Sequence, residues 1–121
     1  MTEPGALRFT HHSRVGMGSE QLWVVAACFN EEAVIIRFIE RVLALPQVSR
    51  LLLIDDGSSD ATVAVIRAWQ QSHPDLGLTL LELTRNFGKE AAMLAGLDFA
   101  DGRCGAACLL YTSDAADDSL G

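Results

Sequence analysis

Residues 22–32 read LWVVAACFNEE, and this stretch decides the fold. Its first eight residues, 22–29, are all apolar. An apolar run of that length predicts a strand that is buried on both faces, as the central strands of parallel sheets are. Asn30 then offers a helix N-cap, while Glu31 and Glu32 place negative charge in a first helical turn. The stretch therefore predicts a buried strand that leads directly into a helix.

The same alternation continues along the chain. Apolar residues at helical spacing follow Glu32, and Pro46 ends that predicted helix. The next predicted elements are a strand at 51–54, a helix at 61–72, a strand at 78–83, and a helix at 89–100 ended by Gly102. The βαβαβα order predicts an α/β fold with a parallel sheet, right-handed connections and helices on both faces.

Composition narrows the class of protein. The chain has 121 residues, half of them hydrophobic, which suits one domain with a packed core. Its formal net charge is −7 and its nine basic residues are scattered singly, which argues against a nucleic-acid-binding surface. No apolar run reaches the roughly 18 residues of a membrane span, and no secretory signal opens the chain. Three cysteines form no disulfide framework, so we predict a cytoplasmic, reducing setting.

The N-terminal end of the chain differs from its middle. Residues 1–21 lack periodicity and predict a flexible N-terminal extension, so we expect the domain to begin at Leu22.

Polar residues cluster in the three loops that follow the predicted strands. In an open α/β sheet, ligands bind beyond the carboxyl ends of the strands. Asp55 and Asp56 end the second strand, and two adjacent carboxylates repel each other unless something binds beside them. A ligand with hydrogen-bond donors, such as a uracil N–H or ribose hydroxyls, would satisfy one of them. Turn formation and helix capping alone also explain Gly57 and Ser58.

Lys89 opposes the local electrostatics, because a cation in the first turn of a helix is unfavourable for the helix dipole. An anion shared by Lys89, Arg85 and the free N–H groups of that turn would reverse this effect, and a pyrophosphate is such an anion. The alternative is that Lys89 pairs with Glu90 or is simply solvated.

Together the loops resemble those of family 2 glycosyltransferases, which have the GT-A, Rossmann-like fold. The resemblance is strongest to the polyprenyl-phosphate branch, which includes dolichol-phosphate mannose synthase. Three segments carry it, in this order and spacing: VVAACFNEE at 24–32, LIDDGSSDAT at 53–62 and RNFGKEAA at 85–92. The resemblance covers about residues 22–102.

The resemblance implies a nucleotide-sugar site. It assigns Phe29 and Glu31 to the base pocket, Asp55 or Asp56 to base donors, and Lys89 to the diphosphate. The full set of residues expected in the site is Phe29, Asn30, Glu31, Asp55, Asp56, Gly57, Ser58 and Lys89. One departure is Ala27, which stands where the family usually has a proline.

A larger departure follows Gly102, where the family has a fourth strand and an Asp-X-Asp metal motif. Asp114, Asp117 and Asp118 do not have that spacing, so no metal-ligating residue is assigned. Residues 108–121 resemble translated sequencing-adapter read-through, and we interpret them as non-native. The incomplete domain would then be 22–107, with the catalytic residues and any membrane segments beyond it.

The resemblance implies that the intact enzyme transfers a sugar from a nucleotide-diphosphate sugar to a polyprenyl phosphate, undecaprenyl or dolichyl. It also implies a divalent cation, Mg²⁺ or Mn²⁺, and action at the cytoplasmic face of the inner membrane, with membrane association only through segments outside this chain. The chain alone is expected to have no turnover. Two alternatives are an inert α/β module and a receiver-like signalling domain, which also places paired acids after a strand.

Overall fold

The sheet forms because three apolar strands can be buried only by pairing with one another. The computed structural model describes residues 8–10, 22–103 and 106–111. Within these residues the sheet has the order β1-β5-β2-β3-β4. Its strands are β1 (Arg8–Thr10), β2 (Leu22–Cys28), β3 (Val48–Asp55), β4 (Leu78–Glu82) and β5 (Ala106–Tyr111).

The central strands run parallel. β2 pairs with β3 along its whole length, from Leu22 opposite Val48 to Cys28 opposite Asp55. β3 pairs with β4 and β2 with β5, also in parallel. Since β2 and β3 each have two neighbours and helices on both sides, residues 23–28 and 51–56 are all buried. This burial accounts for their uninterrupted apolar sequence up to Cys28 and Ile54.

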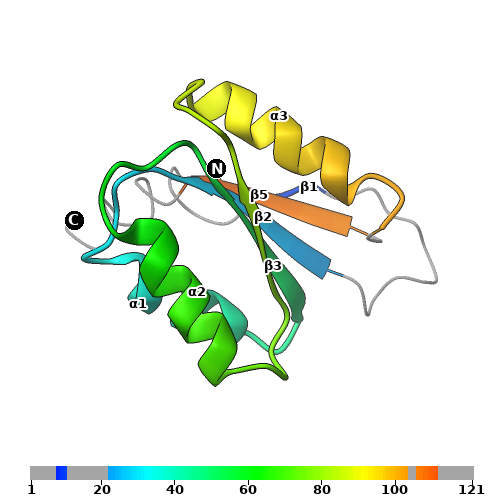
Figure 1. Cartoon of the computed structure of the whole chain (residues 1–121). Coiled ribbons are helices and arrows are strands. Elements are labelled where there is room, and N and C mark those ends of the chain that lie inside the picture. The colour runs from blue at the N-terminus through cyan, green and yellow to red at the C-terminus, as the bar shows by residue number, and fades with distance from the viewer. Residues whose placement is uncertain (1–7, 11–21, 104–105, 112–121) are drawn as a thin grey trace.

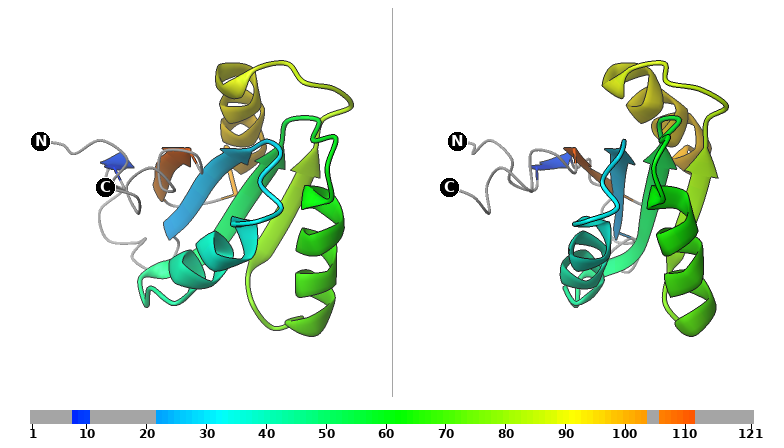
Figure 2. Two further views of the ribbon diagram at one scale, coloured as in Figure 1. Left: turned by 90° about the vertical axis from the view of Figure 1, so that its left-hand side faces the viewer. Right: turned by 60° about the vertical axis from the view of Figure 1, so that its left-hand side comes forward.

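Three helices cover the two faces of the sheet: α1 (Ile35–Leu43), α2 (Thr62–Ser72) and α3 (Lys89–Ala100). Figures 1 and 2 show α3 on one face, with α1 and α2 on the other. The α1 and α2 face holds a core around Val24, Leu51, Leu53 and Ile66. The α3 face holds a second core. The predicted α/β fold with a parallel sheet is confirmed.

α3 approaches the sheet closely because Gly96 lacks a side chain. A Cβ at Gly96 would lie 2.8 Å from Val25 Cγ1 and would also meet the Ile54 side chain. This close approach holds α3 against β2 and β3.

Two strands were not anticipated from the sequence. β1 lies inside the expected flexible extension and pairs antiparallel with β5. β5 crosses the expected boundary after residue 107, and it joins the sheet beside β2. An apolar run next to the open edge of a central strand satisfies its backbone by pairing there, whatever its origin. The non-native interpretation of 108–121 stays a prediction, and 112–121 lie outside the described residues.

Candidate functional site

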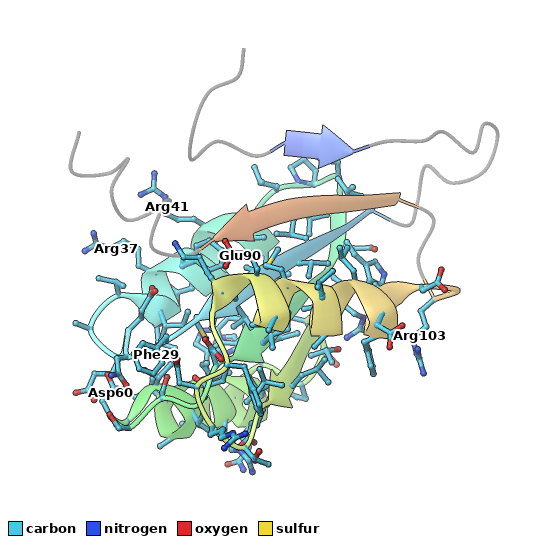
Figure 3. The ribbon with its side chains drawn as sticks, turned by 90° about the horizontal axis from the view of Figure 1, so that it is seen from above. Phe29, Arg37, Arg41, Asp60, Glu90 and Arg103 are labelled. Carbon is cyan, nitrogen blue, oxygen red and sulfur yellow. The ribbon has the colours of Figure 1, made fainter. Side chains whose placement is uncertain are left out.

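Three loops meet at the carboxyl ends of β2, β3 and β4. They comprise residues 29–32, 56–61 and 83–88. In Figure 3, Phe29, Asp60 and Glu90 lie toward the end of the molecule at which α3 begins, and Arg103 lies beyond the other end of that helix. The predicted grouping of the polar loops at one edge of the sheet is therefore present.

Asp55 holds its own turn. It is the last residue of β3 and its side chain is buried. Ser58 donates its backbone N–H to Oδ2 at 2.9 Å and its hydroxyl to Oδ1 at 2.6 Å. The Cys28 thiol also faces Oδ1, at 3.8 Å. Burial, reinforced by the negative charge of Asp55, raises the pKa of Cys28 far above its ordinary value, so the thiol keeps its proton.

Asp56 holds a different loop. Its carboxylate accepts the backbone N–H groups of Phe87 at 2.8 Å and Gly88 at 3.0 Å, and the side-chain amide of Asn86 at 3.1 Å. The expectation that something binds beside the adjacent carboxylates is met by the protein itself, and a ligand role for either residue stays a prediction. Asp55 and Asp56 point to different partners, and donors from the protein itself compensate both charges.

Asn30 joins the first loop to the second. Its backbone N–H donates to Ser58 Oγ at 2.8 Å. Its side-chain Oδ1 accepts the N–H groups of Ser59 at 2.8 Å and Asp60 at 3.2 Å. The predicted N-cap role is wrong, since Asn30 has a left-handed φ of 49° and α1 begins only at Ile35. The Asn30 side chain therefore links the first and second loops and does not cap α1.

Two variants separate the roles of the Asn30 backbone and side chain. Asn30→Gly removes only the side-chain bonds and is expected to lower the free energy of unfolding by about 1 kcal/mol. Asn30→Ala also places a Cβ without a local hydrogen bond in the left-handed region, at a further cost of about 1–2 kcal/mol. Urea unfolding of both variants measures the difference. Equal stabilities would show that the left-handed conformation is not retained.

Reciprocal bonds strengthen the same junction. Ala61 N–H donates to Glu32 Oε1 at 2.7 Å, and Glu32 N–H donates to Asp60 Oδ2 at 3.3 Å. The Thr62 hydroxyl is buried, donates to Asp60 and accepts the Glu31 N–H at 2.8 Å. Desolvation acts to raise the pKa of Asp60, but the bonds from Thr62 and Glu32 outweigh it and lower the pKa.

The residues expected in the site did not include several members of this network, among them Thr62 and Asn86. Thr62 follows Asp60 by two residues at the start of a predicted helix, which is a capping pattern and a usable signal. Asn86 had no such local signal, because its partner Asp56 lies 30 residues away in the sequence.

Gly57 lets the second and third loops touch. Its φ is 76°, and a Cβ placed there would lie 2.5 Å from Asn86 N. Gly57 therefore meets two requirements. It allows the predicted turn, and it lets the backbones of the second and third loops approach closely.

The remaining expected residues form the outer part of the site. Phe29 is 41% exposed at the end of β2, and Phe87 is 49% exposed with the Arg85 guanidinium 4.9 Å from its ring centre. Glu31 is half-buried, and Lys89 is exposed as the first residue of α3. Hydrogen bonds thus join Asn30, Asp55 and Ser58, whereas Phe29 lies on the first loop and Lys89 at the start of α3.

The described residues do not fit a divalent cation. Among them there is no group of three His, Cys, Asp or Glu side chains that could hold a metal ion. Asp55 and Asp56 are engaged by loop donors. Asp114, Asp117 and Asp118 lie outside the described residues.

Known proteins have sequences similar to that of this chain. Residues 23–118 match the family model "Glycosyl transferase family 2". The dodecaprenyl-phosphate galacturonate synthase of Rhizobium johnstonii is 44% identical over 89 residues, which cover 70% of this chain and 26% of that protein. The bactoprenol glucosyl transferase of Shigella phage SfV is 41% identical over 83 residues, covering 65% and 26% respectively. The chain thus spans about a quarter of the length of the curated relatives it matches.

Solved structures share the fold. The mannosyltransferase PcManGT from Pyrobaculum calidifontis, solved with GDP-Man and Mn²⁺, superposes with a TM-score of 0.62 at 29% identity. The match covers 66% of this chain and 24% of that one. TarS from S. aureus has the same TM-score at 17% identity and covers 75% of this chain and 27% of its own, which supports the fold alone.

The family model matches residues 23–118, which include most of the chain and all three loops. This match excludes the receiver-like alternative. The chain belongs to glycosyl transferase family 2, with the GT-A type of fold.

Proposed function

We propose that this chain forms the donor-nucleotide side of an enzyme that transfers a sugar from a nucleoside diphosphate sugar to a polyprenyl phosphate. The observation that carries the proposal is the junction of three strand-end loops through Asn30, Asp55 and Asp56. Relatives named for dodecaprenyl phosphate and bactoprenol support the class of acceptor. The solved relative with GDP-Man supports the class of donor.

The loops would divide the donor between them. Phe29 offers an exposed aromatic face for stacking a base, and Asn30, Glu31, Gly57 and Ser58 lie in the two loops beside it. Lys89 and the N–H groups of the first turn of α3 would face the diphosphate, since both favour negative charge. Stabilising the diphosphate as it leaves is the largest electrostatic task of such a transfer.

A divalent cation accompanies the donor in the Pyrobaculum enzyme. We expect Mg²⁺ or Mn²⁺ in the enzyme proposed here as well, held by residues other than those described, because these provide no ligand cluster. The described residues bind and orient the donor, and the cation would supply positive charge that stabilises the leaving diphosphate.

We expect the reaction at the cytoplasmic face of the inner membrane, because the proposed acceptor is a membrane lipid. α3 is the longest described helix at 12 residues, and no described helix has the length and hydrophobicity needed to cross a bilayer. We propose that other segments contact the lipid, and we expect these 121 residues to bind donor without turnover. Robust glycosyl transfer by the purified chain would contradict that expectation.

Lys89 gives a direct test, because it is the single lysine of the sequence. We expect UDP or GDP to slow acetylation of its amine at least tenfold, measured by peptide mass spectrometry, with the N-terminal amine as internal reference. Lys89→Gln should weaken nucleoside diphosphate binding about tenfold in calorimetric titration, or about 1.4 kcal/mol. Arg103→Gln, at the opposite end of α3, is the matched loss of one positive charge and should leave binding unchanged.

The same titration addresses the inert α/β module. Absence of binding by UDP, GDP and their sugar conjugates at millimolar concentration, with the fold intact, would favour that alternative over a donor site.

A further inference from the structure

Asp56 is the first residue of the second loop, yet its side chain holds the third loop. Its two oxygens accept bonds from Asn86, Phe87 and Gly88, and its backbone carbonyl accepts a further bond from the Asn86 side chain at 3.1 Å. Its neighbour Asp55 behaves differently, because its side-chain bonds go to Ser58 and Cys28. The two carboxylates therefore hold two different segments.

Little of the Asp56 carboxylate is left for a ligand. The residue is only 3% exposed. A carboxylate offers about four lone-pair sites, and donors of the 86–88 segment take three of them. The same three bonds offset the cost of burying the negative charge.

The held segment leads directly into α3. Gly88 has a φ of 106° and precedes Lys89, the first residue of the helix, and the Gly88 carbonyl accepts the Ala92 N–H at 3.0 Å. Because the N–H groups of Phe87 and Gly88 both point at Asp56, the orientation of these two peptide groups is fixed. The position of Lys89 and of the N–H groups after it follows from that orientation.

We propose that Asp56 is a positioning residue for the donor diphosphate: it holds the Asn86–Gly88 segment, and so the first turn of α3 and Lys89, in the binding position. The inference rests on the proposed function and deepens it. It gives Asp56 a role on the diphosphate side of the site, where it acts through the loop.

Asp56→Asn is the informative variant because it is nearly isosteric. Its side chain keeps one acceptor oxygen, but its NH₂ group must face one of the three donors of the 86–88 segment. At least one bond is lost and a donor meets a donor, while the volume of the core is unchanged.

The first measurement compares ligands with and without a base. Inorganic pyrophosphate and UDP are titrated into wild type and Asp56→Asn, followed by NMR shifts. We expect both affinities to fall by the same factor, at least tenfold. If UDP binding falls and pyrophosphate binding does not, Asp56 contacts the base and the proposal is wrong.

The second measurement needs no ligand, so it separates this proposal from the proposed function. In Asp56→Asn, hydrogen exchange at the Phe87 and Gly88 amides should accelerate at least tenfold, while the amides of Leu52 and Leu53 in β3 exchange as in wild type. Asp55→Asn is the matched control and should accelerate exchange at Ser58 instead. Unchanged exchange at Phe87 and Gly88 overturns the proposal, even if wild type binds no nucleotide and the proposed function fails.

Discussion

Gly57→Ala is expected to lower the free energy of unfolding by about 2–4 kcal/mol and to weaken nucleoside diphosphate binding at least tenfold. Two costs add. The φ of 76° disfavours any residue with a Cβ, and that Cβ would lie 2.5 Å from Asn86 N. Backbone cannot move aside as a flexible side chain can, so the third loop must shift away from the second. Chemical denaturation and calorimetric titration measure the two effects.

Gly102→Ala isolates the first of these costs. Gly102 has a φ of 80°, but a Cβ there would have no neighbour within 4 Å. This variant should lose only about 1–2 kcal/mol of stability and keep its affinity for nucleotide. If the two alanine variants were equally stable and bound nucleotide equally, the contact between Gly57 and the third loop would have no energetic role.

Leu53→Ala is expected to cost about 2–5 kcal/mol, the range for deleting a fully buried leucine side chain. Leu53 is 0% exposed in the middle of β3, where it pairs with Ala26 on β2 and Leu80 on β4. Its side chain belongs to the core beneath α1 and α2. The fixed backbone of a central strand cannot collapse into the cavity. Because folded domains are stable by only about 5–15 kcal/mol, such a loss is a large share of the total.

Leu94→Ala is the same chemical change at an exposed position. Leu94 lies on α3 and is 66% exposed, so the change should fall within about 0.5 kcal/mol of wild type. Urea unfolding of both variants gives the comparison. A loss at Leu94 close to that at Leu53 would mean that this face of α3 is covered in solution.

The fold was largely predictable because its signals are local. The apolar run at 22–28 needs burial on both faces, and this requirement by itself places β2 inside the sheet. The predicted helix at 89–100 matches α3 residue for residue. β1 and β5 were missed because short segments at a sheet edge are decided by the available partner and not by their own periodicity.

The candidate site was predictable only as a set of loops. Topology places all three at the carboxyl edge of the sheet, and this much follows from the order of strands and helices. Which residue holds which loop did not follow. Asn30 was expected to cap its own helix, and instead its side chain accepts bonds from residues 59 and 60.

The sequence by itself determined the parallel α/β architecture, the family and the edge at which polar residues gather. All three depend on patterns that extend over a few neighbouring residues or on motifs in fixed order. The tertiary structure alone decided the roles of Asp55 and Asp56, which are adjacent in sequence and chemically identical. Successive residues at a strand end point to opposite sides, so one carboxylate meets Ser58 and the other meets a loop 30 residues away.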